Sequence, residues 1–138
     1  MVQRLHRRDT RSVERRLISS GSSWEARYGY SRAVVVGPHV HVAGTAPIME
    51  GDADPPPDPY GQARRCLEII LGALDEAGAS ADDVVRVRVF VTDAAHSSEV
   101  MRAHGEVFGT ARPANTAVVA GLLDPRWLVE IEAEAYLG

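Results

Sequence analysis

Three carboxylates at every second position, Glu130, Glu132 and Glu134, are the side chains of this chain best arranged to do chemistry. The alternation of a strand puts them on one face and puts apolar residues on the other. Those apolar residues are Trp127, Val129, Ile131, Ala133 and Ala135. Like charges at this spacing repel. The face is therefore open to water, matched by cations on neighbouring strands, or part of a site in which a buried glutamate with a raised pKa acts as acid or base.

Several kinds of chemistry are excluded by residue type. All 15 basic residues are arginines, so a lysine Schiff base, a lysine general base and an ordinary pyridoxal enzyme are ruled out. The single cysteine, Cys66, cannot form an internal disulfide and is expected to pack in the core rather than act as a nucleophile. His39 and His41 share one face of an expected strand, but no third ligand accompanies them, so we predict no metal site.

The elements that must position these groups follow from periodicity. Strands are predicted at 31–37, 39–45, 84–92, 115–120 and 127–137, and helices at 60–77 and 97–108, with a proline-rich loop at 50–59. In the strand at 84–92, alternation predicts one face of Val85, Val87, Val89 and Val91 and another of Arg86, Arg88 and Phe90. The order β-β-α-β-α-β-β predicts an α+β two-layer sandwich with helices on one face of the sheet. The helix-free, charged face suits contact with other copies of the chain.

Length and composition bound the rest. The 138 residues predict one domain. The net charge of -4, the absence of lysine and the 6% aromatic content argue against nucleic-acid binding. No run reaches the ~18 apolar residues of a membrane span, and we expect a cytoplasmic protein. Residues 1–16 hold six arginines without apolar periodicity. They predict a basic, mobile arm, with weak anion or nucleic-acid contact as the minor alternative.

Six blocks in the right order resemble the Rid family, also called YjgF or RidA-like, over residues 17–138. They are Tyr28–Gly37, Val40–Thr45, Gln62–Ile70, Ala77–Asp93, Arg112–Ala114 and Val129–Ala133. The resemblance implies a chorismate-mutase-like subunit with a mixed sheet. It also implies a homotrimer whose sheets line a central barrel, with small-molecule clefts between subunits. The best-known members hydrolyse enamines and imines, such as 2-aminoacrylate, to keto acids and ammonia, without metal or organic cofactor.

The resemblance also implies the site residues. Glu130 matches the glutamate that positions the attacking water, Tyr30 a pocket aromatic, Gly44 a point of close backbone approach, and Met101 a pocket position that is often polar. Asn115 occupies the place of the arginine that clamps the substrate carboxylate. An amide in place of that charged fork costs on the order of 1–3 kcal/mol for a carboxylate ligand.

Arg112 lies three residues before Asn115, and an odd offset in a strand points to the opposite face. It is therefore a poor substitute for the missing arginine.

Two functions follow. The first is a divergent trimer that performs imine or enamine hydrolysis, or related acid–base chemistry, through Glu130, but is not a standard 2-aminoacrylate deaminase. The alternative is a non-catalytic small-molecule-binding or regulatory protein. Endoribonuclease or ribosome-directed activity is disfavoured by the net acidity, the absence of lysine and the low aromatic content.

Overall fold

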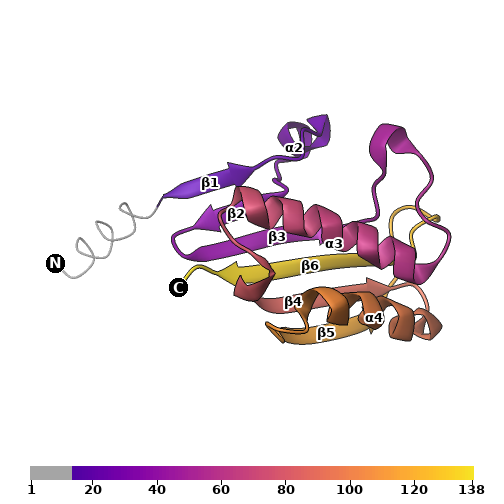
Figure 1. The fold of residues 1–138 in the computed structure, drawn as a ribbon. Coiled ribbons are helices and arrows are strands. Elements are labelled where there is room, and N and C mark those ends of the chain that lie inside the picture. Colours follow the sequence, from indigo (N-terminus) through magenta and orange to yellow (C-terminus); the bar gives the residue numbers. More distant parts are fainter. Residues whose placement is uncertain (1–13) are drawn as a thin grey trace.

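The computed structural model describes residues 14–138 and contains one six-stranded sheet in the order β1-β2-β3-β6-β4-β5 (Figure 1). The strands are β1 (Arg15–Ile18), β2 (Ala33–Val36), β3 (His39–Thr45), β4 (Val84–Val91), β5 (Ala114–Val119) and β6 (Val129–Tyr136). The helices are α2 (Ser23–Tyr28), α3 (Pro59–Glu76) and α4 (Ser97–Phe108), with 3-10 turns η1 (Glu50–Asp52), η2 (Ala81–Asp83) and η3 (Ala94–His96). None of the helices within residues 14–138 has the length and apolar character to cross a membrane.

The sheet is mixed, as predicted, because β5 runs parallel to β4 while every other pair is antiparallel. The parallel pair requires a crossover, which α4 provides. α3 and α4 cover the same face of the sheet (Figure 1). The predicted α+β two-layer architecture is therefore confirmed. β5 is an edge strand, and all six of its residues are exposed.

α3 is built by clear local signals. Asp58 caps it by accepting a hydrogen bond from the Gly61 backbone, and Pro59 occupies the first turn, where its missing N–H costs nothing. Gly78, in the left-handed region at φ 84°, ends it. Cys66 is fully buried with its pKa raised by burial. The prediction that Cys66 packs in the core is confirmed.

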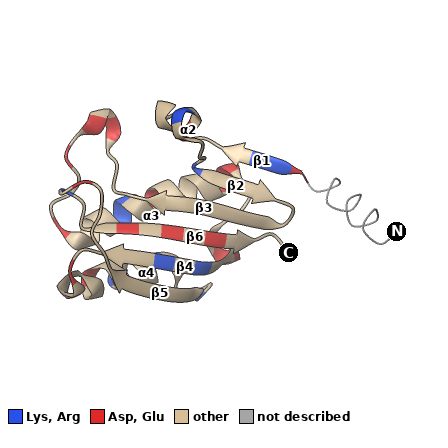
Figure 2. Ribbon diagram, turned by 180° about the vertical axis from the view of Figure 1, so that it is seen from behind, with Lys and Arg blue, Asp and Glu red and all other residues tan. Residues whose placement is uncertain are grey.

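The opposite face of the sheet carries the charges. Arg86 lies beside Glu134 and Arg88 beside Glu132 across the β4–β6 pair, and Figure 2 shows the blue and red bands side by side. Arg88 approaches Glu132 at 3.6 Å and Glu134 at 3.7 Å. Arg88 on the neighbouring strand thus pairs with two of the three carboxylates. The third, Glu130, lies opposite Phe90 instead.

Three details differ from the sequence-based expectations. β1 and α2 were not predicted, and β1 takes Arg15 and Arg16 out of the expected arm; residues 1–13 of that arm lie outside the described part. The Arg16 guanidinium donates to the Ala77 carbonyl at 3.2 Å. The prediction that Val85 shares a face with Val87, Val89 and Val91 was wrong. A bulge shifts the β4–β6 register between Val84 and Arg86, so Val84 is buried and Val85 is 52% exposed.

Candidate functional site

Glu130 is a half-buried carboxylate on the helix-free face of β6. Its neighbours in the strand, Val129 and Ile131, are fully buried on the other face. Burial raises the pKa of Glu130, the nearby Arg32 guanidinium opposes that change, and Glu132 adds to it. A carboxylate with these neighbours can take up and release a proton closer to neutral pH than an exposed one.

Gly44 makes room for this carboxylate. The β3–β6 register runs from Val42 opposite Ala133 to Thr45 opposite Ile131, so β3 carries one extra residue there. A Cβ on Gly44 would lie 3.4 Å from Cδ of Glu130 and inside contact distance of its Oε2. The bulge therefore brings the Gly44 backbone directly against the Glu130 carboxylate, and any side chain at position 44 would displace it.

Arg32 fixes the bulge and was missed by the sequence reading. Its Nη2 donates to the carbonyl oxygens of Ala43 and Gly44, both at 2.7 Å. Its Nε is buried without a partner among the described residues. Burial lowers the pKa of Arg32, while Glu25, Tyr30 and Glu130 act in the opposite direction. The guanidinium thus holds the backbone of β3 by hydrogen bonds and interacts electrostatically with the Glu130 carboxylate.

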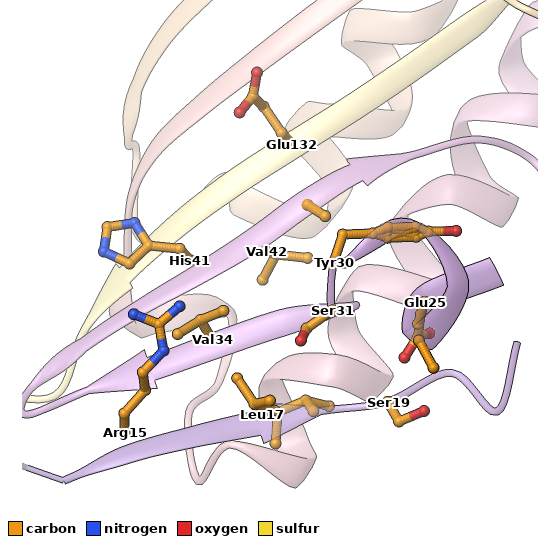
Figure 3. A pocket seen from close by; sticks show the side chains of 14 residues that line it. Arg15, Leu17, Ser19, Glu25, Tyr30, Ser31, Val34, His41, Val42 and Glu132 are labelled. Carbon is orange, nitrogen blue, oxygen red and sulfur yellow. The ribbon is translucent and has the colours of Figure 1, made fainter. Parts of the chain in front are cut away.

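Tyr30 belongs to the same region. With Arg32 and Gly44 it lines a cavity of about 160 Å³. It also borders a larger groove of about 760 Å³ between β1, α2 and the sheet. Figure 3 shows this groove with Glu25 on α2 and Tyr30 next to that helix, and with His41 and Glu132 on the strands across it. We call Tyr30, Arg32, Gly44 and Glu130 the glutamate cluster.

Asn115 lies elsewhere. It pairs in register with Val87 of β4, which is fully buried under the helices, so both side chains belong to the helix-covered face. Its Nδ2 lies 3.2 Å from Nε2 of His104 on α4. Met101, one helical turn before His104, is partly buried against the core. We call Met101, His104 and Asn115 the asparagine cluster; the role of His104 in it was also missed.

His104 is a buried histidine with its pKa lowered by burial. Its ring packs at a tilt on Phe108, with centroids 5.0 Å apart. Within residues 14–138, the ring of His104 makes one hydrogen bond, with the amide of Asn115 on the edge strand. The sequence signal that could have found it is a histidine on the apolar stripe of a helix, which needs a polar partner when buried.

The two clusters do not meet within one chain. Glu130 lies on the open face of β6, and Asn115 lies on the helix side of the edge strand, two strands away in the sheet order. Arg112 is exposed at φ 52°, before β5 begins, so its side chain is not governed by the alternation of the strand. The structure thus groups Tyr30, Gly44 and Glu130, and separately places Asn115 against His104, with Met101 one helical turn from that histidine.

The histidine pair on β3 is also placed. His39 and His41 lie on the exposed side of the strand with ring centroids 6.3 Å apart, and His39 meets the ring of Tyr136 edge-on. Over residues 14–138, no group of three or more His, Cys, Asp or Glu side chains is arranged to hold a metal ion.

Comparisons with known proteins cover nearly the whole chain. The family model described as Endoribonuclease L-PSP matches residues 20–137. An uncharacterised protein of Streptomyces coelicolor is 39% identical over 124 residues, covering 89% of this chain and 92% of that protein. A RutC family protein of Pyrococcus abyssi is 39% identical over 114 residues, covering 78% and 85%.

Solved structures agree. A crystal structure from Mycobacterium tuberculosis, described as a member of the YjgF/YER057c/UK114 family, is 44% identical. It has a TM-score of 0.81 and covers 89% of this chain and 99% of that one. A structure from Thermotoga maritima, described as a putative endoribonuclease, is 31% identical with a TM-score of 0.75, covering 87% and 91%.

Proposed function

This chain belongs to the Endoribonuclease L-PSP family, which is also the YjgF, RutC or Rid family, and from that premise we propose that it works as a homotrimer with a small-metabolite cleft between subunits. In each cleft the glutamate cluster of one subunit faces the asparagine cluster of the next. Each cluster is incomplete alone, and they occupy different faces of the subunit. A closed ring joins two different patches of identical subunits at every interface, as such a pairing requires.

We further propose that the trimer hydrolyses a small imine or enamine, and Glu130 carries this proposal. The half-buried carboxylate is held against Gly44 with Arg32 nearby. Burial makes it a stronger base than an exposed glutamate, and Arg32 favours the ionised form that a base needs at neutral pH.

The reaction balances without further components. Glu130 takes a proton from water while the water oxygen bonds to the carbon of the protonated imine, which gives a neutral carbinolamine. Glu130 then returns that proton to nitrogen, and the C–N bond breaks. Ammonia leaves while Glu130 takes the hydroxyl proton and the carbonyl forms, and passing that proton to ammonia restores the carboxylate.

The asparagine cluster limits the substrate. Asn115 carries no charge, so it cannot neutralise a carboxylate in a cleft that already holds Glu130. Bringing two negative charges together in a partly desolvated place is costly. The protein is therefore not a standard 2-aminoacrylate deaminase, and the substrate is neutral or cationic at the end that meets Asn115.

The same substitution supports the second candidate, a small-molecule-binding or regulatory protein without catalysis. In that case the cleft still binds a small molecule, and the absence of the carboxylate-binding arginine at position 115 goes with a loss of deaminase activity. The endoribonuclease description of the Thermotoga maritima relative is not extended to this chain, since its net charge of -4 and lack of lysine disfavour RNA.

A matched pair of variants tests catalysis. Imines that lack a carboxylate are generated in situ from several primary amines by a flavin amine oxidase, and formation of the carbonyl product is followed against semicarbazide trapping. Wild type should accelerate hydrolysis of at least one imine. Glu130→Gln should lose at least ~100-fold of that rate, while Glu132→Gln, the next carboxylate in the same row, should stay near wild type. A wild type no faster than buffer on every imine would remove the enzyme reading and leave the binding protein.

A further inference from the structure

The contact between Asn115 and His104 determines which atoms Asn115 offers to a ligand. An amide nitrogen can only donate, so Nε2 of His104, at 3.2 Å, must accept. His104 is then neutral with its proton on Nδ1. This form suits its surroundings because the ring is 8% exposed and packed on Phe108.

One hydrogen of the Asn115 amide is thus committed to His104. The side chain is otherwise exposed on the edge strand, and its oxygen has no partner within residues 14–138. The amide therefore presents an acceptor and at most one N–H. A carboxylate has only acceptors, so it can use at most the one free N–H and leaves Oδ1 without a donor. A primary amide, an amidine or an ammonium group brings N–H donors that Oδ1 can accept.

The amide orientation and the ring tautomer are coupled. With Nδ2 towards the ring, as in this structure, Nε2 is unprotonated, and turning the amide over would bring two acceptors together. The amide can turn only if Nε2 gains a proton, by a change of tautomer or by protonation of the ring, because the ring then donates.

The charges near α4 lie on its outer side. Arg102 pairs there with Glu99 and Glu106, and Arg64 of α3 also reaches Glu106. Burial lowers the pKa of His104, and no ion pair joins its ring to a carboxylate within residues 14–138.

We propose that His104 is a positioning residue that fixes the hydrogen-bonding polarity of Asn115, so that the cleft selects ligands bearing an N–H donor and rejects carboxylates. The recognition of a ligand rests on the proposed inter-subunit cleft. The hydrogen bond between His104 and Asn115 lies within one subunit and does not depend on that cleft, so it is measured separately.

The pairing is tested by nitrogen NMR on the full-length protein. Asn115 is the only asparagine of the chain, so ¹⁵N-asparagine labelling gives a single side-chain amide signal. With histidine labelled as well, a scalar coupling across the Nδ2–H···Nε2 hydrogen bond and the Nδ1–H tautomer of His104 are expected near pH 7.5. Below the lowered pKa of His104, the coupling should vanish and the amide signal should shift. An Nε2–H tautomer at pH 7.5 would overturn the proposal.

The selectivity is tested with three probes of one shape: benzamide, benzamidine and benzoate. Changes in the Asn115 amide signal report binding at this side chain. Both donor probes should bind at least tenfold more tightly than benzoate. His104→Phe keeps a ring of similar size but frees the amide to turn, so the preference should shrink at least fivefold. Val107→Ile, on the same helix and partly buried against the core without a hydrogen bond, should keep it.

Equal or tighter binding of benzoate by wild type, or no binding of either donor probe, would overturn the selectivity. If His104→Phe does not fold, the tautomer and the probe ranking of wild type still decide. Failure of imine hydrolysis with donor selectivity intact would count against the catalytic proposal alone.

Discussion

Replacing Gly44 with alanine should damage activity far more than stability. The added Cβ would lie 3.4 Å from Cδ of Glu130 and under 3.0 Å from its Oε2. Ordinary carbon contacts need about 3.5 Å, so the carboxylate must retreat by roughly 0.5–1 Å. The φ of Gly44 is not positive, so alanine introduces no backbone strain.

The effects of Gly44→Ala on stability and on reaction rate should differ greatly in size. The clash meets only the end of a flexible side chain, and replacing glycine reduces the entropy of the unfolded chain by about 0.4–1 kcal/mol. The melting temperature should therefore stay close to that of wild type. A misplacement of about 1 Å costs up to roughly 100-fold in rate, so imine hydrolysis should fall by about 10- to 100-fold.

Two controls make the assay specific. Gly72→Ala adds a Cβ to α3 with nothing within 4 Å. It should stabilise the protein by about 1 kcal/mol without changing the rate. In the background of Glu130→Gln, Gly44→Ala should cause no further loss, because both changes act through one carboxylate. Full activity of Gly44→Ala, or additive losses in the double variant, would refute the reasoning.

Four further outcomes are expected. Wild type should be slow on 2-aminoacrylate, and Asn115→Arg should strengthen carboxylate binding by about 5- to 150-fold; wild-type turnover matching an arginine-bearing relative would contradict this. Because burial raises the pKa of Glu130 in the fold, the stability that its protonated form contributes is lost as pH rises through that pKa. Glu130→Gln should therefore melt higher than wild type near pH 7, with the difference closing towards pH ~4; a lower melting temperature at pH 7 would argue against it. Light scattering should give three times 14.9 kDa, and Arg88→Glu, beside two glutamates, should loosen that assembly; a wild-type monomer at micromolar concentration would exclude the trimer. Deleting residues 1–13 should leave the melting temperature within a few degrees in a thermal-unfolding scan, and a large drop would mean that they pack on the fold.

Much of the fold could be predicted from the sequence because the longer strands and helices have a clear hydrophobic periodicity. The alternation of β6 and the apolar stripe of α3 each run through several turns or pairs, and both were placed correctly. β1 and α2 have only 4 and 6 residues, too few for a period to emerge. The bulge at Val85 breaks alternation without any change in residue type, so a row of valines concealed it.

The candidate site was partly readable. Tyr30, Gly44 and Glu130 stand in blocks that the family resemblance aligns, and they do lie in one region. Arg32 and His104 were missed because their partners are backbone carbonyls across a bulge and an asparagine on another element. Such contacts depend on register and on the crossover through α4, which single-sequence periodicity does not encode.

The two outer strands of the sheet differ in how they meet other chains. β1 carries Arg15 and Arg16, and charge on an edge discourages a second strand from adding there. β5 reads Ala-Asn-Thr-Ala-Val-Val, uncharged and exposed along its length. A newly made subunit therefore has one edge strand, β5, with which another strand can pair. The longer the subunit stays monomeric, the greater its chance of aggregating through β5. Storage at high concentration, which favours the assembled state by mass action, should therefore preserve the protein best.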